Sequence, residues 1–264
     1  MARAKRRLGQ HFLTDRRILE RIADALGVTP ADTVLEIGPG PGGLTEVLVA
    51  RAGKLVAIEK DADLVPDLRA RVPGATVVEA DALEADWHAL AGPEFRVAGN
   101  IPYNITSPLL DKALAPPRPR RIVFLVQREV ADRVGAEPGA EAYGALSVGV
   151  QAVAQAERLF TVPAGAFHPR PQVDSAVLSL TPLAEPVVED DEVAPFRRLV
   201  VGLFGFRRKQ MGRGLRELTG WEAPLVERAL ATAGIPPTVR PETVSPRAFA
   251  GLLRALVDGG WPGR

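Results

Sequence analysis

The sequence contains no cysteine and only three histidines in 264 residues. The missing thiols exclude disulfides, thiolate metal sites and cysteine nucleophiles. His11, His88 and His168 are far apart in the chain, so they lack the paired spacing that is typical of metal-binding histidines. We therefore expect no metal site, and we interpret each histidine as a surface or capping residue.

Long apolar runs are also missing. No run reaches the roughly 18 apolar residues of a membrane-spanning helix, and the basic segment 1–17 lacks the apolar stretch of about 7–15 residues found in secretory signals. Hydrophobic residues make up 46% of the chain and charged residues 25%, which is ordinary for a globular protein. We expect a cytoplasmic protein that does not bind membranes, with one large domain and one small one.

The net charge is only +1, but the positive charge is concentrated in two segments. Residues 1–22 hold seven arginines and lysines against two acidic residues, and residues 196–217 hold seven against one. Two such clusters on an otherwise balanced chain are typical of a protein that contacts a polyanion at particular places. The alternative is a solvated helix face in an arginine-rich chain, and charge alone favours neither interpretation.

Short β-branched runs alternate with amphipathic segments in the first half of the chain. Strand-like runs cover residues 33–38, 54–60, 75–81, 96–100 and 121–127, and helix-like segments include 44–52 and 61–72. This alternation predicts an open, doubly wound α/β fold, a Rossmann-like parallel sheet with helices on both faces. Such sheets bind ligands outside the carboxyl ends of their strands, so the residues after each strand are the first candidates for a site.

A glycine-rich turn follows the first predicted strand. Gly38, Gly40 and Gly43 fit the pattern G-x-G-x-x-G at a strand-to-helix junction, which is typical of dinucleotide binding. Pro39 and Pro41, however, have no backbone N–H to donate to a pyrophosphate. The loop therefore suits a nucleoside without a phosphate, such as S-adenosylmethionine, better than it suits NAD.

Acidic residues end the next two predicted strands. Glu59 follows the glycine turn by about 20 residues, where a carboxylate can accept both hydroxyls of a ribose. Asp81 ends the third strand, where it can accept a hydrogen bond from an adenine amino group. A single glycine-rich turn is often only a turn, and a single aspartate often only a helix cap. Three such features at successive strand ends favour a nucleoside site.

The fourth predicted strand ends in Asn-Ile-Pro-Tyr, residues 100–103. The nitrogen of a base's exocyclic amine is a poor nucleophile until hydrogen-bond acceptors pull it toward tetrahedral geometry, and the side-chain oxygen of Asn100 and the carbonyl of Ile101 offer two acceptors. Pro102 fixes the turn, and Tyr103 offers a ring on which an extruded base can stack. Cytosine C5 methylation is disfavoured, because it normally uses a cysteine adduct. For this motif alone, an ordinary strand-to-turn junction with a buried tyrosine is the alternative.

These motifs, with further blocks along nearly the whole chain, resemble the ribosomal RNA adenine dimethyltransferases of the KsgA type. The matching segments are LGQHFLTD (8–15), VLEIGPGPGGLT (34–45), VAIEKD (56–61), EADAL (79–83), GNIPYNITSPLL (99–110), AYGALSV (142–148), AFHPRPQVDSAVLSL (166–180), LFGFRRKQM (203–211) and GIPPTVRPETVSP (234–246). The resemblance implies a class I methyltransferase fold and N6,N6-dimethylation of two adjacent adenosines in the 3′-terminal hairpin of small-subunit (16S) ribosomal RNA. It also implies S-adenosylmethionine as methyl donor and a role in ribosome biogenesis on the 30S assembly particle.

The resemblance also assigns residues. The implied cofactor contacts are His11, Leu13, Gly38, Gly40, Glu59, Asp81 and Asn100. The implied target-base site is Asn100, Ile101, Pro102 and Tyr103, with Phe167 stacking on the base from the other side. Two departures from the family pattern are present. His11 replaces the asparagine often seen in the N-terminal motif, and Arg213 and Gly214 stand where an asparagine-containing sequence usually follows the basic run.

The two basic segments then become candidate RNA contacts. We assign this role to Arg6, Arg7, Arg207, Arg208 and Lys209, because arginine suits bidentate contact with phosphates. The proline-rich, acidic segment 181–195 predicts a boundary between a methyltransferase domain with a basic arm, residues 1–185, and a helical RNA-orienting domain, residues 186–264. We expect a monomer.

Three other interpretations stay open. The nearest is the related group that methylates an adenosine of large-subunit ribosomal RNA and confers macrolide resistance, although the blocks RRKQ and RPETVSP favour the small-subunit type. From another class, the protein could be an assembly factor that acts mainly by binding. A nicotinamide dehydrogenase is the weakest alternative, because of the two prolines in the glycine loop.

Overall fold

The computed structural model describes residue 5 and residues 9–262, and its packing divides the chain into two compact units. The first, which we call the sheet unit, comprises the chain up to Ala131 together with Ala156–Pro182. The second, the helical unit, comprises Asp132–Gln155 and the chain from Leu183 onward. The chain passes into the helical unit for the last time at Leu183, near the boundary expected at residue 185. The segment 132–155, which we expected to be part of the first domain, packs with the helical unit.

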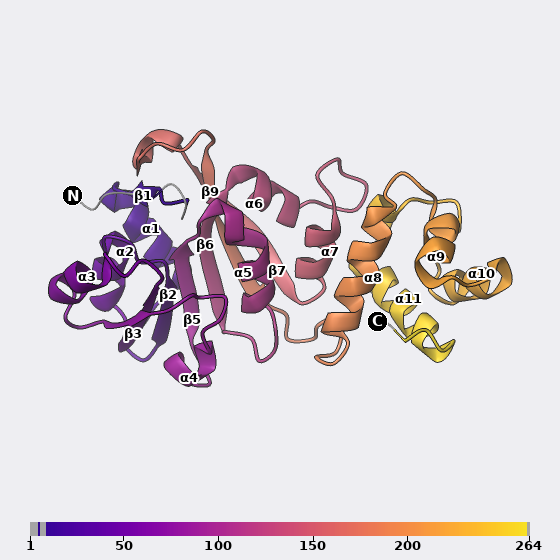
Figure 1. Ribbon diagram of the computed structural model, residues 1–264, viewed down its shortest axis with the longest axis horizontal. Helices are drawn as coiled ribbons and strands as arrows, with labels where there is room; N and C mark the ends of the chain where they lie inside the picture. Colours follow the sequence, from indigo (N-terminus) through magenta and orange to yellow (C-terminus); the bar gives the residue numbers. More distant parts are fainter. Residues whose placement is uncertain (1–4, 6–8, 263–264) are drawn as a thin grey trace. The chain divides into compact units, whose positions relative to one another are not determined.

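A seven-stranded sheet, counted over the described residues, forms the centre of the sheet unit (Figure 1). Its strands are β2 (Thr33–Ile37), β3 (Lys54–Glu59), β4 (Thr76–Glu79), β5 (Arg96–Asn100), β6 (Arg121–Gln127), β7 (Ala154–Val162) and β9 (Ser175–Pro182), in the order β4-β3-β2-β5-β6-β9-β7. Strands β2 to β6, all predicted from the sequence, pair in parallel.

Strand β9 runs antiparallel to β6, so the sheet is mixed and not parallel throughout as expected. Parallel pairing of successive strands requires a long crossover, usually through a helix. The connection from β7 to β9 contains only the 3-10 turn η3 (Ala164–Ala166) and the short strand β8 (Phe167–His168). Because this connection contains no crossover helix, β9 can only turn back and run antiparallel to the strand before it.

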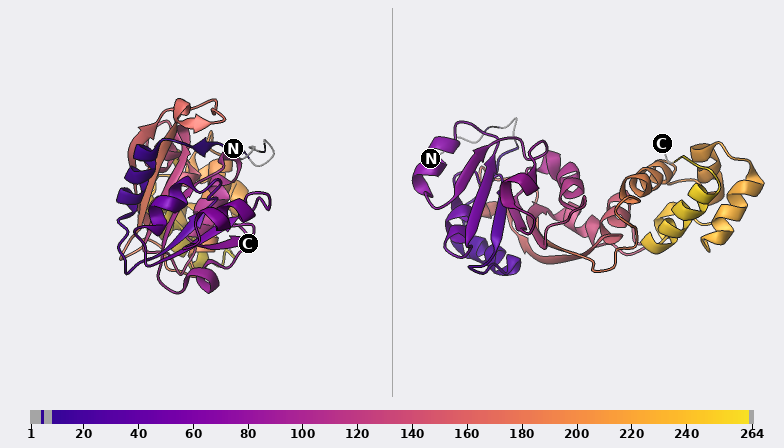
Figure 2. Two further views of the ribbon diagram at one scale, coloured as in Figure 1. Left: turned by 90° about the vertical axis from the view of Figure 1, so that its left-hand side faces the viewer. Right: turned by 90° about the horizontal axis from the view of Figure 1, so that it is seen from below.

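Helices cover both faces of the sheet (Figures 1 and 2). On one face, α1 (Arg16–Leu26) and α2 (Gly43–Val49) pack on alternate residues of the strands, and the buried cluster includes Leu19, Ile22, Leu26, Val34, Leu44, Leu48, Leu55, Val123 and Val177. The helix α3 (Val65–Arg71) packs through Val65 and Leu68 in a smaller cluster beside β4. The opposite face carries α4 (Trp87–Ala91) and α5 (Thr106–Ala113). Strands buried on both faces explain the continuous apolar runs in the sequence.

The first helix shows how local sequence sets these elements. Its N-cap, Asp15, accepts hydrogen bonds from the backbone N–H groups of Arg17 and Ile18, and its C-cap, Gly27, has a φ of 65°. An aspartate that receives the free N–H groups and a glycine in the left-handed region are the usual signals for the start and end of a helix. The helix therefore begins directly after the N-terminal motif LGQHFLTD, and it holds the end of that motif in place beside the core.

A two-stranded sheet connects the N-terminal motif to the β7–β9 connection (Figure 1). The strand β1 (Phe12–Leu13) pairs antiparallel with β8, with Leu13 opposite Phe167. The N–H of Thr14 extends the contact by donating to the carbonyl of Ala166 at 3.1 Å. This pairing joins segments that are about 150 residues apart in sequence and brings the N-terminal motif to the carboxyl end of β5.

The helical unit contains α7 (Ala145–Gln151), α8 (Val193–Gly205), α9 (Met211–Thr219), α10 (Ala223–Thr232), the 3-10 turn η4 (Pro241–Thr243) and α11 (Pro246–Asp258), while α6 (Arg128–Val134) runs across the boundary between the units. Its core includes Tyr143, whose buried hydroxyl donates to the carbonyl of Val244 at 2.9 Å. Burial raises the pKa of this phenol above its usual value. Over the residues that the structure describes, no helix has the length and apolar character needed to cross a membrane.

Candidate active site

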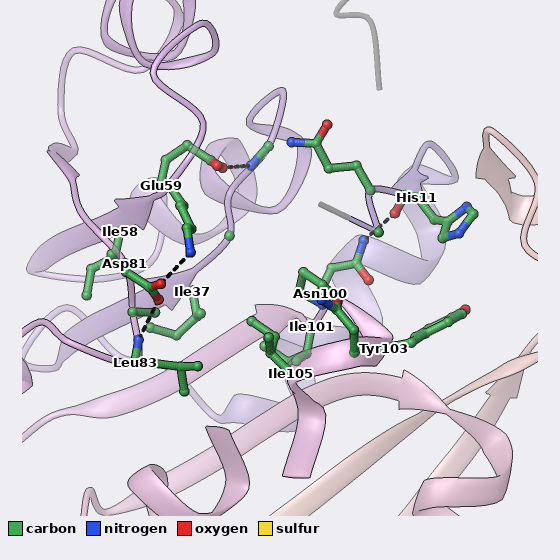
Figure 3. A pocket seen from close by; sticks show the side chains of 18 of the residues that line it. His11, Ile37, Ile58, Glu59, Asp81, Leu83, Asn100, Ile101, Tyr103 and Ile105 are labelled. Atoms are coloured by element: carbon green, nitrogen blue, oxygen red, sulfur yellow. Dashed lines mark hydrogen bonds and ion pairs between the residues drawn. The ribbon is translucent and has the colours of Figure 1, made fainter. Parts of the chain in front are cut away.

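A pocket lies at the carboxyl ends of β2 to β5, the edge at which a sheet of this kind binds its ligand (Figure 3). Its lining comes from the N-terminal motif, from the ends of the strands and from the short segments after β4 and β5. The lining residues are Gly9, Gln10, His11, Phe12, Ile37, Gly38, Gly40, Ile58, Glu59, Lys60, Ala80, Asp81, Ala82, Leu83 and residues 100–105. All of them belong to the sheet unit. The four strand ends that the sequence analysis singled out therefore meet in one place.

The glycine loop offers no free backbone N–H to a phosphate over the described residues 38–42. The N–H groups of Gly38, Gly40 and Gly42 donate respectively to the Ile58 carbonyl, the Glu59 carboxylate and the Pro39 carbonyl, each at 3.0 Å. The two intervening residues are prolines, which have no N–H. Residues 38–42 therefore offer a pyrophosphate no donor of their own, and only the first N–H groups of α2 remain at this turn. The loop itself suits a nucleoside without a phosphate.

Glu59 is a buried acceptor at the end of β3. It is 5% exposed, and its two carboxylate oxygens accept hydrogen bonds from the N–H groups of Gly40 at 3.0 Å and Asp61 at 2.8 Å. Burial raises the pKa of this carboxyl, although the two backbone donors work against that effect. Each oxygen keeps a further lone pair, and the residue lines the pocket. This arrangement suits an acceptor of two ribose hydroxyls.

Asp81 lies after β4, on the side of the pocket away from Tyr103 (Figure 3). Its carboxylate pairs with the Lys60 ammonium at 2.5 Å and accepts from the N–H of Leu83 at 2.9 Å. The bond from Lys60 lowers the pKa of Asp81 below its ordinary value, so the group is ionised at neutral pH. Ile58 and Leu83 line the pocket beside it. A carboxylate acceptor between apolar side chains matches an adenine ring with an amino group.

Asn100 is fixed by the N-terminal motif. Its side-chain nitrogen donates to the backbone carbonyl of His11 at 2.7 Å, and its side-chain oxygen points away from His11, on the side of Tyr103 (Figure 3). Ile101 follows with its side chain buried and its N–H bonded to the Leu125 carbonyl at 3.0 Å. The turn at Pro102 is closed by the N–H of Ile105, which donates to the proline carbonyl at 3.1 Å. The amide oxygen is thus held as an acceptor within the pocket lining.

Tyr103 begins the 3-10 turn η2 (Tyr103–Ile105) and stands at the side of the pocket away from Asp81 (Figure 3). Its hydroxyl shares a hydrogen bond of 2.8 Å with the side chain of Ser175, and its ring stacks with the ring of His11 at a centroid distance of 5.7 Å. Burial raises the pKa of the phenol, so it is neutral at physiological pH. His11 also lines the pocket, as the resemblance implies, and it touches both Asn100 and Tyr103.

Two of the implied site residues lie outside the lining of this pocket. Leu13 and Phe167 face each other across the β1–β8 pair, and both side chains are buried in the core cluster beneath α1. Leu13 lines a neighbouring cavity that also includes Gly38 and Asn100. In the described structure Phe167 supports the β1–β8 pair, and its stacking role stays a prediction.

The assigned RNA contacts fall into two groups. Arg6 and Arg7 lie outside the described residues. Arg207 and Arg208 are exposed in the helical unit after α8, where Arg207 donates to the carbonyl of Glu141 at 3.0 Å. Lys209 forms an ion pair with Glu217, which also accepts from Arg213, so part of the positive charge counted in the sequence is neutralised within the unit.

The N-terminal segment is bonded to the residues after β3, a link that no pattern in the sequence predicted. Lys5 forms 2.5 Å ion pairs with Asp61 and Asp63, and the Gln10 side chain donates to Asp61 at 3.0 Å. Burial alone would raise the pKa of Asp61, but these donors outweigh it and hold the pKa below its usual value. Because the N–H of Asp61 also donates to Glu59, the N-terminal segment is linked to the proposed ribose acceptor. The signal available in the sequence was a second acid two residues after Glu59.

The residues present fit S-adenosylmethionine. The N–H groups of Gly38, Gly40 and Gly42 are already bonded, Glu59 offers acceptors to a ribose, and the apolar walls near Asp81 suit a purine. A Cβ added to Gly40 would lie 3.0 Å from the ring of Phe12, and the φ of 56° at this position also favours glycine. The sheet order and a site of this composition define a Rossmann-like, S-adenosylmethionine-dependent methyltransferase.

The family model for ribosomal RNA adenine dimethylase matches residues 1–233. The chain therefore belongs to the ribosomal RNA adenine dimethylase family. Enzymes of this family use S-adenosylmethionine to methylate adenosines of ribosomal RNA. The fold class, the enzyme class and the cofactor expected from the sequence are confirmed.

Similar proteins cover nearly the whole chain. Proteins named ribosomal RNA small subunit methyltransferase A are 44% identical over 265 residues in Geobacter metallireducens, covering 97% of this chain and 96% of the relative, and 44% identical over 266 residues in Bordetella pertussis, covering 98% and 97%. Among solved structures, the 23S rRNA methyltransferase ErmE is 30% identical with a TM-score of 0.72, covering 93% of this chain and 99% of that one. A dimethyladenosine transferase from Plasmodium falciparum is 24% identical with a TM-score of 0.80, covering 95% and 99%, and it shares the fold.

Proposed function

We propose that this chain dimethylates N6 of two adjacent adenosines in the 3′-terminal hairpin of small-subunit (16S) ribosomal RNA, acting as a cytoplasmic monomer on a 30S assembly particle. The observation that carries the proposal is the fixed amide of Asn100, whose nitrogen is bonded to the His11 carbonyl while its oxygen remains an acceptor in the pocket. The names of the relatives support small-subunit RNA as the substrate.

The chain's own residues prepare the amine for attack. When bound, S-adenosylmethionine supplies an electrophilic methyl group on its sulfonium. The side-chain oxygen of Asn100 and the carbonyl of Ile101 accept the two N6 hydrogens of adenosine, which draws the nitrogen lone pair out of conjugation with the ring. Tyr103 stacks on the extruded base. No general base is required during attack, since the methylated nitrogen becomes acidic and loses its proton to solvent afterwards.

The pair of acceptors also accounts for two rounds of transfer to one nitrogen. The first product, N6-methyladenosine, still carries one N–H, and that hydrogen can bond to either acceptor. The monomethylated base can therefore be held and activated in the same way as the original adenosine. After the second transfer neither hydrogen remains, so the dimethylated base loses both bonds and is released more readily.

The helical unit contributes by orienting the RNA. Arg207 and Arg208 are exposed beside the end of α8, and arginine side chains contact phosphates without reading sequence. Lys209 contributes less than its formal charge suggests, because Glu217 pairs with it. Contacts of this kind position the substrate, while the choice of nitrogen depends on the pocket in the sheet unit.

The alternative acceptor is an adenosine of large-subunit RNA, because a 23S rRNA methyltransferase shares the fold at 30% identity. The test incubates the protein and methyl-labelled S-adenosylmethionine with 30S particles, naked 16S RNA and 50S particles from cells that lack both activities. We expect label in the small-subunit RNA, mapped to two adjacent N6,N6-dimethyladenosines near its 3′ end. Label in 23S RNA, or a single monomethylated adenosine, would overturn the proposal.

If the protein is instead an assembly factor that acts only by binding, 30S particles should mature without methylation. Cells that lack this enzyme are supplied with the wild-type protein or with Asn100→Ala, and both the RNA methylation and the yield of mature 30S particles are measured. We expect both proteins to bind the assembly particle and only the wild type to methylate it. Equal methylation by the two proteins would remove Asn100 from the site, whereas equal maturation without methylation would assign the cellular role to binding.

A further inference from the structure

The ring of Tyr103 is held from two sides by residues to which the mechanism above gives no side-chain role. Its hydroxyl bonds to Ser175 at 2.8 Å, and one face of its ring lies against the imidazole of His11, with 27° between the two planes. Ser175 begins β9 and is fully buried, so its hydroxyl has a fixed partner and no access to solvent. The two supports come from opposite ends of the sheet unit's sequence, yet they converge on one ring.

The His11 ring is itself anchored. Its Nδ1 lies 2.8 Å from the carbonyl of Pro169, in the segment that follows β8. The pairing of β1 with β8 places both segments side by side, with Phe12 opposite His168. The imidazole therefore cannot rotate away from Tyr103 without breaking a bond to the β7–β9 connection, the same connection that leads into Ser175.

The backbone of His11 orients the second half of the target-base site. Its carbonyl accepts the hydrogen bond from the Asn100 side chain at 2.7 Å. His11 therefore orients the side-chain amide of Asn100 through its backbone carbonyl, and its imidazole packs against the ring of Tyr103. Because a base that stacks on Tyr103 must also present its amine to Asn100, the relative placement of these two groups decides whether both contacts form at once.

We propose that His11 and Ser175 are positioning residues for the target base, which clamp the Tyr103 ring so that its face opposite His11 stacks on the adenine. This inference rests on the proposed function, since it presupposes that a base enters beside Tyr103. It assigns the His11 side chain to the base site, where the family resemblance had assigned the residue to the cofactor. The cofactor pocket then depends on His11 only through backbone geometry.

The clamp predicts different behaviour for different replacements of His11. His11→Phe keeps a ring against Tyr103 and loses the bond to Pro169, whereas His11→Ala loses both. Both variants keep the carbonyl that orients Asn100. We expect His11→Ala to lower kcat/KM for RNA by about 10-fold, as the loss of part of a stacking interaction would, and His11→Phe to restore most of that loss. Neither should change the Kd for S-adenosylmethionine by more than about 2-fold, and His88→Ala on α4 serves as the histidine control.

Ser175 is tested by a double-mutant cycle with Tyr103→Phe, which removes the partner hydroxyl. We expect Ser175→Ala to lower kcat/KM several-fold in the wild-type background and to have no further effect in the Tyr103→Phe background. Ser179→Ala, a buried serine on the same strand, and Tyr143→Phe, the only other tyrosine in the sequence, are the matched controls. Additive effects of Ser175→Ala and Tyr103→Phe would contradict the clamp.

A spectroscopic measurement separates stacking from general damage to the fold. RNA with 2-aminopurine at the target position is titrated with each variant, and fluorescence is recorded as the base leaves its helix and stacks on Tyr103. We expect a quenched bound state for the wild type and for His11→Phe, and a bright bound state for His11→Ala. Equal quenching by all three proteins, or a raised Kd for S-adenosylmethionine in His11→Ala, would overturn the inference. If the wild type itself methylates no small-subunit RNA, the proposed function fails instead, and the cycle can be repeated on whichever RNA it modifies.

Discussion

The side-chain nitrogen of Asn100 donates a 2.7 Å hydrogen bond to the backbone carbonyl of His11, a residue 89 positions earlier in the chain. This bond decides which end of the amide is available as an acceptor, because a nitrogen committed to His11 leaves the oxygen for a substrate. It also joins the N-terminal motif to the candidate active site, although the described residues of that motif contribute no strand to the main sheet. The predictions below follow from this arrangement and from its surroundings.

The carboxylate of Glu59 is expected to determine cofactor affinity. Glu59→Gln replaces one oxygen with an NH2 group, which then faces a backbone N–H of either Gly40 or Asp61 and cannot accept from it. The variant also keeps only one oxygen to accept from the ribose hydroxyls, and loss of one such bond at a buried site costs about 1–3 kcal/mol, so we expect the Kd for S-adenosylmethionine to rise roughly 10-fold or more. Isothermal titration measures it, with the exposed Glu79→Gln on β4 as control. Equal affinity of both variants would place the ribose elsewhere.

Gly40 is expected to tolerate no side chain. Its φ of 56° lies in the left-handed region, and a Cβ would stand 3.0 Å from the Phe12 ring. A non-glycine residue pays roughly 1–2 kcal/mol for that backbone conformation, and the contact would push the N-terminal motif away from the pocket. Gly40→Ala should therefore lower thermal stability and weaken cofactor binding together. Gly165→Ala, which meets no atom within 4 Å and has no positive φ, should do neither; matching melting curves for the two variants would refute this account.

Glu36 is expected to give the protein a pH-dependent stability. The side chain is 1% exposed, and burial, with a contribution from the nearby Glu59 carboxylate, raises its pKa to about 8. The unfolded chain releases this proton near pH 4.3, so the free energy of unfolding falls by up to about 1.4 kcal/mol per pH unit between pH 4.3 and 8 and then levels off. Glu36→Gln removes this contribution.

Urea unfolding at pH 5, 7 and 9 measures the difference in free energy of unfolding between the wild type and Glu36→Gln. Relative to the wild type, the variant should gain stability from pH 5 to 7 and again to pH 9, where the folded wild type carries a buried charge. Glu79→Gln, on the exposed side of β4, is the control for replacing a glutamate in this sheet. A constant difference between the wild type and Glu36→Gln across the three pH values would mean that Glu36 ionises normally in the folded protein.

The exposed arginines of the helical unit are expected to bind phosphates. Removing both side chains in Arg207→Ala/Arg208→Ala should weaken RNA binding and flatten the dependence of log K on log salt by roughly 1.5, because each lost phosphate contact removes about 0.7–0.9 from the slope. Cofactor affinity should not change. A control pair, Arg228→Ala/Arg247→Ala, removes the same charge from α10 and α11 of the same unit. If both double variants show the same slope of log K against log salt, Arg207 and Arg208 make no specific phosphate contact, and the effect comes only from the lower net charge.

Local patterns in the sequence were sufficient for the parallel half of the sheet and for the strand-end residues. Strands β2 to β6 are continuous apolar runs. Glu59 and Asn100 end two of them, and Asp81 lies two residues after the end of a third. Their meeting in one pocket follows from parallel topology, since all carboxyl ends of such strands lie at one edge. The sequence also suggested that the glycine loop suits a nucleoside without a phosphate, and the N–H groups of Gly38, Gly40 and Gly42 are bonded within the protein.

Features that depend on distant pairings were not predictable in this way. The reversal of β9, the bond from Tyr103 to Ser175 and the stacking of His11 on Tyr103 join segments separated by tens of residues or more, and no local period encodes them. The neutralisation of Lys209 by Glu217 likewise requires the turn between α8 and α9. The charge count along the chain included Glu217 but could not say which basic side chains pair with it.

The most direct test of the account is single-turnover methyl transfer by Asn100→Ala with the cofactor affinity measured on the same sample. If the amide oxygen presents the adenosine amine to the methyl group, the rate should fall by about 10²–10³-fold, as it does when one preorganised polar group is lost from other active sites, while the Kd for S-adenosylmethionine rises far less. A wild-type rate of transfer from Asn100→Ala with cofactor fully bound would contradict the account.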